Sequence, residues 1–332
     1  MESFSAWRQY LYPANREALF LSLYETDLPD GVIFRLAAQA RPAILLATAE
    51  SDEDAISLGA SKIGGRPDLP RGSAWPTRPP YPDAGQRAEG HRKEADRLLA
   101  DSRKPRSWMT PEQGDRFSRE YKARADSIEA EFPLAFFAQV DLFELSKEEG
   151  FDPAFPSEGR LLVFYDFWEQ PEDFTPEASV GWQVIWDKTP HAELVRVPFP
   201  AALSSISSDE WTCIFRAARI SARTVLTPIP PNDKSWDAFP LDDDEALEAY
   251  QEWLEQFRHA PMRSIATIIN SAASHRRCRK LLKFAGDWQL VLQIGVDRHA
   301  GIPHPGAYYV IMRKEDIAAR RFDRARVTYQ CD

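Results

Sequence analysis

Cysteine is scarce in this sequence. The 332 residues include three cysteines, Cys213, Cys278 and Cys331. Their odd number and wide spacing exclude a disulfide framework and a zinc knuckle, which need paired or clustered thiols. Dispersed, reduced thiols are typical of the cytosol, so the sequence predicts a cytoplasmic protein.

Positive charge is also in short supply. Lysine and arginine number 41 against 51 aspartates and glutamates, which gives a formal net charge of -10. Non-specific binding to nucleic acid or to anionic membranes needs a basic face, so we expect neither. Mild acidity is common in cytosolic bacterial proteins, and this is the simplest explanation. A basic protein partner is compatible with the same balance.

Long hydrophobic runs are missing as well. The longest, residues 43–49 and 132–140, are too short to cross a bilayer. The first residues include an early acid, Glu2, and no apolar core, so we expect no signal peptide and no membrane association.

Proline and tryptophan are plentiful, at 26 and 10 residues. Many prolines favour extended segments and turns over a helical bundle. Hydrophobic patterning predicts helices in 14–40 and 236–257 and a mixture of short helix and loop in 263–283. Predicted strands are 43–50, 55–65, 159–167, 181–187, 192–200, 288–296, 306–314 and 324–332, and 133–145 is predicted as a strand followed by a short turn or helix. The fold class that follows is α+β.

Two segments interrupt the predicted strands. Residues 64–76, GGRPDLPRGSAWP, contain three prolines and three glycines, so we expect an ordered, extended loop anchored by Trp75. Residues 78–131 are rich in mixed charge, and Thr110 followed by Pro111 is typical of a helix start. This segment is either an inserted helical excursion or partly disordered, and its charges are most simply a solvated face.

Two pairs of segments in the chain are similar in sequence. LAFFAQVDLFEL followed by GRLLVFYDF resembles WQLVLQIGVD followed by GAYYVIMRKEDI. Each has an apolar strand that ends near Gln139 or Gln293, and then a glycine, Gly159 or Gly306, before a second apolar strand. This pattern favours a duplicated β unit over chance similarity. A buried glutamine at such a position clamps a loop backbone more often than it contacts a ligand.

Six segments together resemble the YwqG-like family of bacterial domains of unknown function. They are SKIGGRPDLPRGSAWP, PLAFFAQVDLFEL, SEGRLLVFYDF, DWQLVLQI, GAYYVIMRKEDI and RFDRARVTYQC, in the family's order. The resemblance implies an α+β fold with a repeated antiparallel sheet core, and it implies no catalytic residues. At superfamily level this family resembles the immunity proteins related to Suppressor-of-fused, which bind and neutralise toxins.

The resemblance also sets expected boundaries. It implies an N-terminal helical and strand extension over 1–54 and a YwqG-like domain over 55–332. The domain contains β half-repeats at about 55–200 and 280–332, with the 78–131 insertion absent from typical members. Gly295 stands where the family often has an aspartate, so we expect no equivalent of Asp141 in the second half.

The sequence shows no catalytic constellation. Pro67 and Pro70 prevent the helix that a phosphate loop at Gly64 would need, and no G-x-S-x-G motif is present. His299 and His304, with Asp297, are the best metal candidates, but a polar loop explains them better, so we predict no metal and no cofactor.

We therefore expect a cytosolic protein-binding module, and more specifically an immunity protein that masks the active surface of a basic toxin domain. The expected contact elements are loop 64–76, the insertion 78–131 and the acidic segment 237–255. The candidate contact residues are Arg66, Asp68, Arg71, Trp75, Asp242, Asp243, Asp244 and Glu245. The apolar stripe of the acidic helix, by contrast, is more simply part of the core than a partner groove.

Two alternatives remain open from sequence. One is an enzyme or small-molecule binder with a cleft between the β half-repeats. The residues that would line this cleft are Asp141, Asp166, Asp297 and His299. The other is a purely structural adaptor. The sequence does not decide the oligomeric state.

Overall fold

The structure is a computed structural model that describes residues 13–171, 180–207, 212–229, 244–258, 265–269, 288–302 and 306–330. Within these ranges, no helix combines the length and the apolar character needed to cross a membrane. Cys278, Cys331, His304, Asp242 and Asp243 lie outside the described residues.

Ten strands of the described residues form one sheet in which all neighbours are antiparallel. In order across the sheet they are β14 (Arg326–Gln330), β13 (Ala307–Arg313), β12 (Trp288–Ile294), β11 (Ile265–Ile269), β1 (Arg41–Glu50), β10 (Ala218–Thr227), β2 (Lys62–Ile63), β6 (Ala135–Asp141), β7 (Arg160–Tyr165) and β8 (Trp182–Asp187). The predicted α+β class with an antiparallel sheet core is confirmed.

The two ends of this sheet are built alike. Strands β6, β7 and β8 form one antiparallel meander, and β12, β13 and β14 form another at the opposite end. Each meander has a register shift in its first strand, at Phe137 in β6 and at Val291 in β12. Both shifts lie two residues before the corresponding glutamine, Gln139 or Gln293. A β-bulge fixed at the same offset is what a duplicated β unit predicts.

The capping aspartate is also present in both halves. Asp141 accepts hydrogen bonds from the amides two and three residues ahead, at 3.0 and 3.4 Å. Asp297 does the same, at 2.8 and 2.9 Å. The expectation that the second half lacks this residue is therefore wrong. Gly295 and Val296 follow the end of β12 at Ile294, so the equivalent carboxylate comes two residues later.

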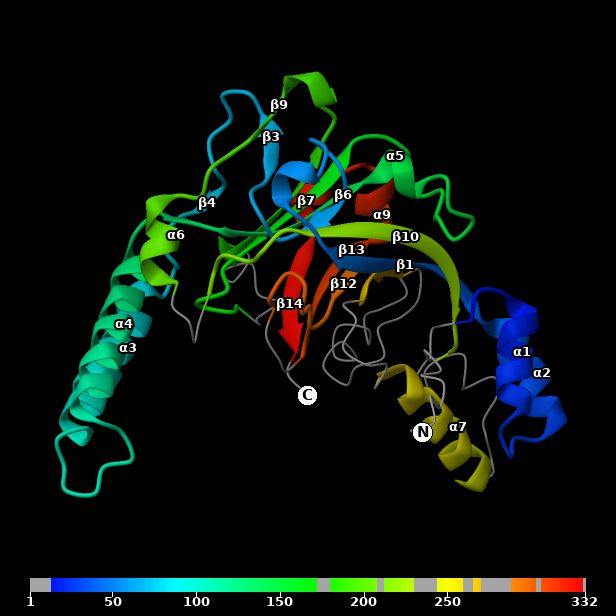
Figure 1. Cartoon of the computed structure of the whole chain (residues 1–332), viewed down its shortest axis with the longest axis horizontal. Coiled ribbons are helices and arrows are strands. Elements are labelled where there is room, and N and C mark those ends of the chain that lie inside the picture. The colour runs from blue at the N-terminus through cyan, green and yellow to red at the C-terminus, as the bar shows by residue number, and fades with distance from the viewer. Residues whose placement is uncertain are drawn as a thin grey trace, which may run out of the picture.

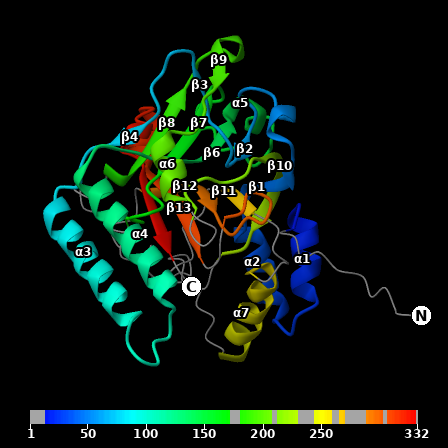
Figure 2. The same cartoon turned by 60° about the vertical axis from the view of Figure 1, so that its left-hand side comes forward.

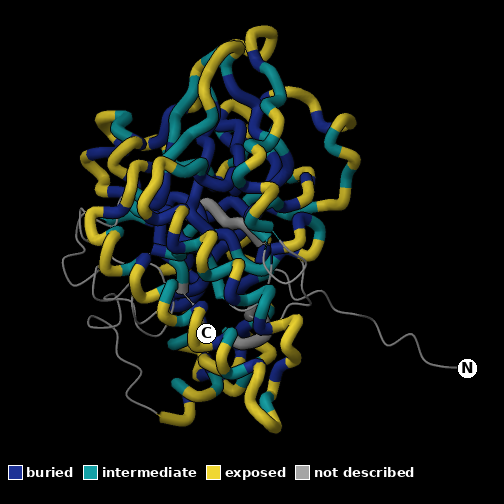
Figure 3. Tube along the Cα trace, turned by 90° about the vertical axis from the view of Figure 1, so that its left-hand side faces the viewer, coloured by how far each residue is buried: buried dark blue, intermediate teal, exposed yellow. Residues whose placement is uncertain are grey.

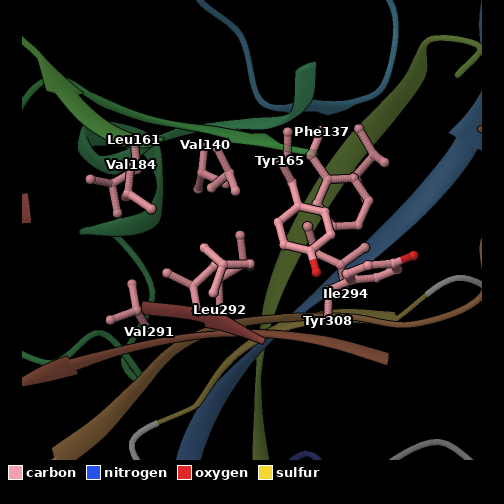
Figure 4. Close-up of a cluster of buried hydrophobic side chains, with 14 of the residues drawn as sticks. Phe137, Val140, Leu161, Tyr165, Val184, Val291, Leu292, Ile294 and Tyr308 are labelled. Atoms are coloured by element: carbon pink, nitrogen blue, oxygen red, sulfur yellow. The ribbon is translucent and has the colours of Figure 1, made fainter. Parts of the chain in front are cut away.

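The sheet curls so that its two ends pack against each other. Figure 4 shows side chains of β6, β7 and β8 facing those of β12 and β13. The Tyr308 ring lies 4.9 Å from that of Phe137 and 5.4 Å from that of Tyr165. Trp182 Nε1 donates to the Ala325 carbonyl at 2.9 Å. The two β units thus share a single hydrophobic core.

A second, smaller core lies beside the sheet. It joins α1 (Arg16–Tyr24), α2 (Asp30–Gln39) and α7 (Asp244–Arg258) through buried residues that include Leu19, Ile33, Tyr250 and Trp253. Figure 1 shows these helices together at one side of the sheet. Strand β1, which follows α2, lies in the middle of the sheet between β10 and β11. Residues 41–50 are therefore part of the sheet core.

Three sequence-based assignments need correction. Residues 265–269, predicted as mixed helix and loop, form strand β11, and β10 was not predicted at all. Charged and polar side chains alternate along the first half of β10, which conceals a central strand whose one face is partly open to solvent. The strand predicted at 55–65 is reduced to β2, preceded by the short 3-10 helix η1 (Glu53–Ala55).

Residues 84–129 form a helical hairpin, which we call the arm. It consists of α3 (Ala84–Asp101) and α4 (Pro111–Glu129). The predicted helix start is confirmed, because Thr110 and Gln113 form a reciprocal capping box. Figures 1 and 2 show the arm projecting from the sheet, with the loop between its helices farthest from the body. The arm is rooted in the two-stranded pair β4 (Thr77–Arg78) and β5 (Phe132–Pro133).

Short elements complete the described fold. They are β3 (Asp68–Pro70), paired with β9 (Leu194–Arg196), together with α5 (Leu142–Leu145), α6 (Ala201–Ile206), α9 (Lys314–Ala318), η3 (His191–Glu193) and η5 (Phe322–Arg324). Figure 3 shows that burial is concentrated in the sheet, while the loops and the outer helix faces are exposed.

Candidate functional site

A buried ionic network fastens loop 64–76 to the sheet. The carboxylate of Asp68 accepts hydrogen bonds from Arg196 Nε at 2.9 Å, Gln139 Nε2 at 2.7 Å and Lys62 Nζ at 3.4 Å. Gln139 Oε1 in turn accepts from the Asp68 amide at 3.1 Å, and its Nε2 also donates to the Ala60 carbonyl at 2.7 Å. The structure therefore supports the interpretation of Gln139 as a clamp on loop backbone.

Burial and charge oppose each other inside this network. Burial alone would raise the pKa of Asp68, but the Arg196 hydrogen bond and the Lys62 charge outweigh it and hold that pKa below its ordinary value. Burial lowers the pKa of Lys62 despite the neighbouring Asp68. Because Lys62, Asp68 and Gln139 are fully buried, the network holds the loop in place and offers no reactive group to solvent.

The four candidate contact residues of the loop differ in accessibility. Arg71 is exposed, and the Arg66 side chain is 34% exposed while paired with Glu53. Trp75 is half-buried and donates through Nε1 to the Leu134 carbonyl at 2.7 Å, as expected of an anchor. Asp68 as a partner contact is wrong, because its buried carboxylate is already occupied by its own chain.

The acidic segment contributes one exposed helix face. Asp244 and Glu245 begin α7 and are exposed, and so are Glu248 and Glu252 further along the helix. The opposite face is buried, where Tyr250 and its neighbours pack against the N-terminal helices. The apolar stripe is thus core, as predicted, and the acids are left on the surface.

The structure does not bring the predicted cleft residues into one cleft. Asp141 pairs with Arg160 at one end of the β6–β7 ladder, whereas Asp166 follows the other end of β7. In an antiparallel pair the ends of successive strands lie at opposite edges, so these two residues are roughly 20 Å apart along the strands. His299 bonds to Thr48 Oγ1 on β1, three strands away from Asp141, a separation on the order of 14 Å.

Asp166 serves instead at the root of the arm. Its Oδ2 accepts from Arg78 Nε at 2.6 Å and from the Tyr81 hydroxyl at 3.0 Å. The guanidinium of Arg78 lies 4.5 Å from the centre of the Tyr81 ring, and its side chain is fully buried. This ion pair joins the β7 end to the strand that leads into the arm.

Glu169 forms the second contact at the root. Its carboxylate pairs with Arg124 Nε, with His91 Nε2 at 3.3 Å and with Arg87 NH1 at 3.6 Å. The Glu169 side chain is only 5% exposed, so both arm helices converge on one buried carboxylate. These residues could not be predicted from sequence, because their charges resemble those of a solvated helix face.

Exposed aromatic side chains are the other feature that sequence analysis did not predict. Trp108, in the loop at the tip of the arm, is 74% exposed, and Phe34 on α2 is 62% exposed. The exposure of Trp108 could have been suspected from sequence, because it is a tryptophan in a charged segment with few large apolar residues.

Cys213 is a free, buried cysteine. Burial raises the pKa of the Cys213 thiol, which disfavours the reactive thiolate. Among the described side chains, no three histidine, cysteine or acidic residues are placed to share a metal ion.

These features define an α+β protein built on one curled antiparallel sheet, with its polar clusters used for internal fastening. A family model described as a domain of unknown function, DUF1963, matches residues 61–331. Because this match covers most of the chain, the protein belongs to the DUF1963 family. A search of the curated proteins finds no match.

Proposed function

We propose that this protein is a cytoplasmic protein-binding module, and specifically an immunity protein that masks the active surface of a basic bacterial toxin. The YwqG-like resemblance of its motifs, and through it the resemblance to Suppressor-of-fused-type immunity proteins, motivates the specific form. In this proposal the protein acts by occupying a surface and not by chemistry.

The observation that carries the proposal is the exposed acidic face of α7. It presents Asp244, Glu245, Glu248 and Glu252 on a helix whose other face is fixed in the core. A rigid row of carboxylates on a chain with net charge -10 suits a basic partner, because electrostatic complementarity increases the association rate and disfavours acidic partners.

The small-molecule alternative assumed that the predicted cleft residues lie close together. Their separation does not support that assumption. Asp141 and Asp166 each cap a local turn, and His299 lies several strands away.

The test begins with affinity capture from the native cell and mass spectrometry, followed by co-expression of each basic partner with this protein. The proposal expects one stoichiometric partner whose toxicity is suppressed. The triple variant Glu245→Lys, Glu248→Lys and Glu252→Lys should weaken binding at least about tenfold and abolish the rescue.

A charge-matched control is available on scattered surface sites. Glu50→Lys, Glu149→Lys and Asp323→Lys change the net charge by the same amount at three exposed positions. This control should retain binding and rescue. Equal loss in both triple variants would mean that net charge alone matters, and unimpaired rescue by the α7 variant would reject the acidic face as the contact.

A further inference from the structure

The tip of the arm is an exposed aromatic site far from the sheet. Trp108 is the most exposed large hydrophobic side chain among the described residues, at 74%. Helix α3 has 18 residues and is therefore about 27 Å long. Figures 1 and 2 both place the loop 102–110 at the end of the arm that is remote from the body.

Contacts within the tip connect its loop to the two helices. Arg103 NH2 pairs with Asp115 Oδ1 at 2.9 Å across the two helices, and Lys104 Nζ pairs with Asp101 Oδ1 at 2.5 Å. Met109, next to Trp108, is buried and fixes the loop against the helices. A side chain on a preorganised loop loses little conformational freedom on binding, which favours affinity.

Arg106 gives an independent observation. Its φ is 64°, in the left-handed region where a glycine would be the more stable residue. Its side chain is exposed, and no ion pair to it is present among the described residues. The exposed guanidinium of Arg106 is therefore available to pair with an acidic group of a partner.

We propose that the arm tip docks into a separate protein partner, with Trp108 filling an apolar pocket and Arg106 pairing with a carboxylate at the pocket rim. Tryptophan and arginine are the side chains most enriched among residues that dominate binding energy. The proposal goes beyond the acidic face of α7, because it assigns a second surface with the opposite charge preference.

Charge decides between a protein pocket and an anionic membrane. Recognition of anionic lipid takes clusters of roughly 4–8 basic residues. At the tip, Arg103 and Lys104 are already neutralised by their own carboxylates, which leaves Arg106. One cation beside one tryptophan fits a single carboxylate beside a pocket. The acidic body does not repel such a partner, because about 27 Å exceeds the roughly 8 Å screening length in cells.

The experiment places a photo-reactive aromatic amino acid at position 108 of the full chain in the native cell. The crosslinked peptide is identified by mass spectrometry, and the purified partner is then titrated with the unmodified chain and its variants. We expect one partner whose crosslinked segment combines aliphatic residues with aspartate or glutamate. Trp108→Ala should weaken binding at least about 30-fold.

Two further variants separate binding from folding. Arg106→Gly should weaken binding about fivefold to tenfold while the thermal midpoint stays equal or rises, because glycine relieves the positive φ. Lys93→Ala, at an exposed position in the middle of α3, should change neither the affinity for the partner nor the thermal midpoint. Three results would each overturn the proposal. They are an unchanged affinity in Trp108→Ala, crosslinks only to a second copy of this chain, and sedimentation with phosphatidylglycerol vesicles that depends on Trp108. If only the α7 triple variant lost binding, the result would support a contact at the acidic face of α7 and would not support docking by the tip of the arm.

Discussion

Gly64 and Gly72 belong to the same loop but face different surroundings. Gly64 has φ 63°, and an added Cβ would lie 2.3 Å from the Arg216 carbonyl oxygen. Gly72 has φ 85° with nothing within 4 Å of its Cβ position. The first glycine therefore allows close packing as well as a left-handed backbone, while the second allows only the backbone conformation.

We expect Gly64→Ala to lower the free energy of unfolding by more than about 3 kcal/mol and Gly72→Ala by about 1 kcal/mol. The difference reflects the backbone oxygen that an alanine at position 64 would displace. Urea unfolding followed by tryptophan fluorescence measures both values. Equal losses in the two variants would show that the close approach of Arg216 has no energetic weight.

At the scale of the element, the root of the arm contains a titratable contact. Burial lowers the pKa of His91, and the nearby Arg124 and Arg87 charges lower it further, against the opposing effect of Glu169. The Tyr121 ring lies 5.8 Å from the His91 ring. Because the folded pKa is below the unfolded value, the unfolded chain binds the proton first, and stability rises with pH.

We expect the seating of the arm to lose stability as the pH falls below about 6.5, the ordinary histidine value. Thermal midpoints measured between pH 5 and pH 8 should fall less steeply on acidification in His91→Gln than in the unmodified protein. His191→Gln, at an exposed turn, is the control and should keep the original slope. Identical pH profiles for all three proteins would contradict a role for His91.

At the scale of the whole molecule, the two β units stabilise each other. Tyr308 in β13 contacts Phe137, Tyr165 and Phe167 of the first unit with ring distances of 4.9, 5.4 and 5.1 Å. Neither unit could bury its inner face without the other, so we expect them to unfold together.

Tyr308→Ala should lower the free energy of unfolding by about 3–5 kcal/mol, through lost burial and the cavity that remains. Hydrogen exchange should accelerate in β6 and β7 as much as in β13. Tyr24→Ala, at a 56% exposed position, should cost about 1 kcal/mol or less. Faster exchange confined to β12–β14 would instead indicate two independently stable halves.

Local chemistry explains what could be predicted from sequence. The Thr110 cap and the core stripe of α7 depend on near neighbours, and both were identified. Strand β3, inside the predicted loop 64–76, was not, because it depends on pairing with the distant β9. Strand β10 could not be, because its alternating arginine and serine side chains resemble a surface segment until β1 and β2 pair with it. The predicted cleft residues were not brought together, because a sequence indicates where a strand ends but not at which edge of the sheet that end lies.

The sequence by itself determined the α+β class and the acidic, cysteine-poor character of the chain, since these follow from composition and local periodicity. Tertiary structure alone decided which charged side chains are buried and which are exposed to a partner. It buries Asp68 and Glu169 under cations from distant segments, and it leaves Trp108 and the acids of α7 at the surface. The physical reason is that burial depends on contacts between residues far apart in the chain, which no local pattern records.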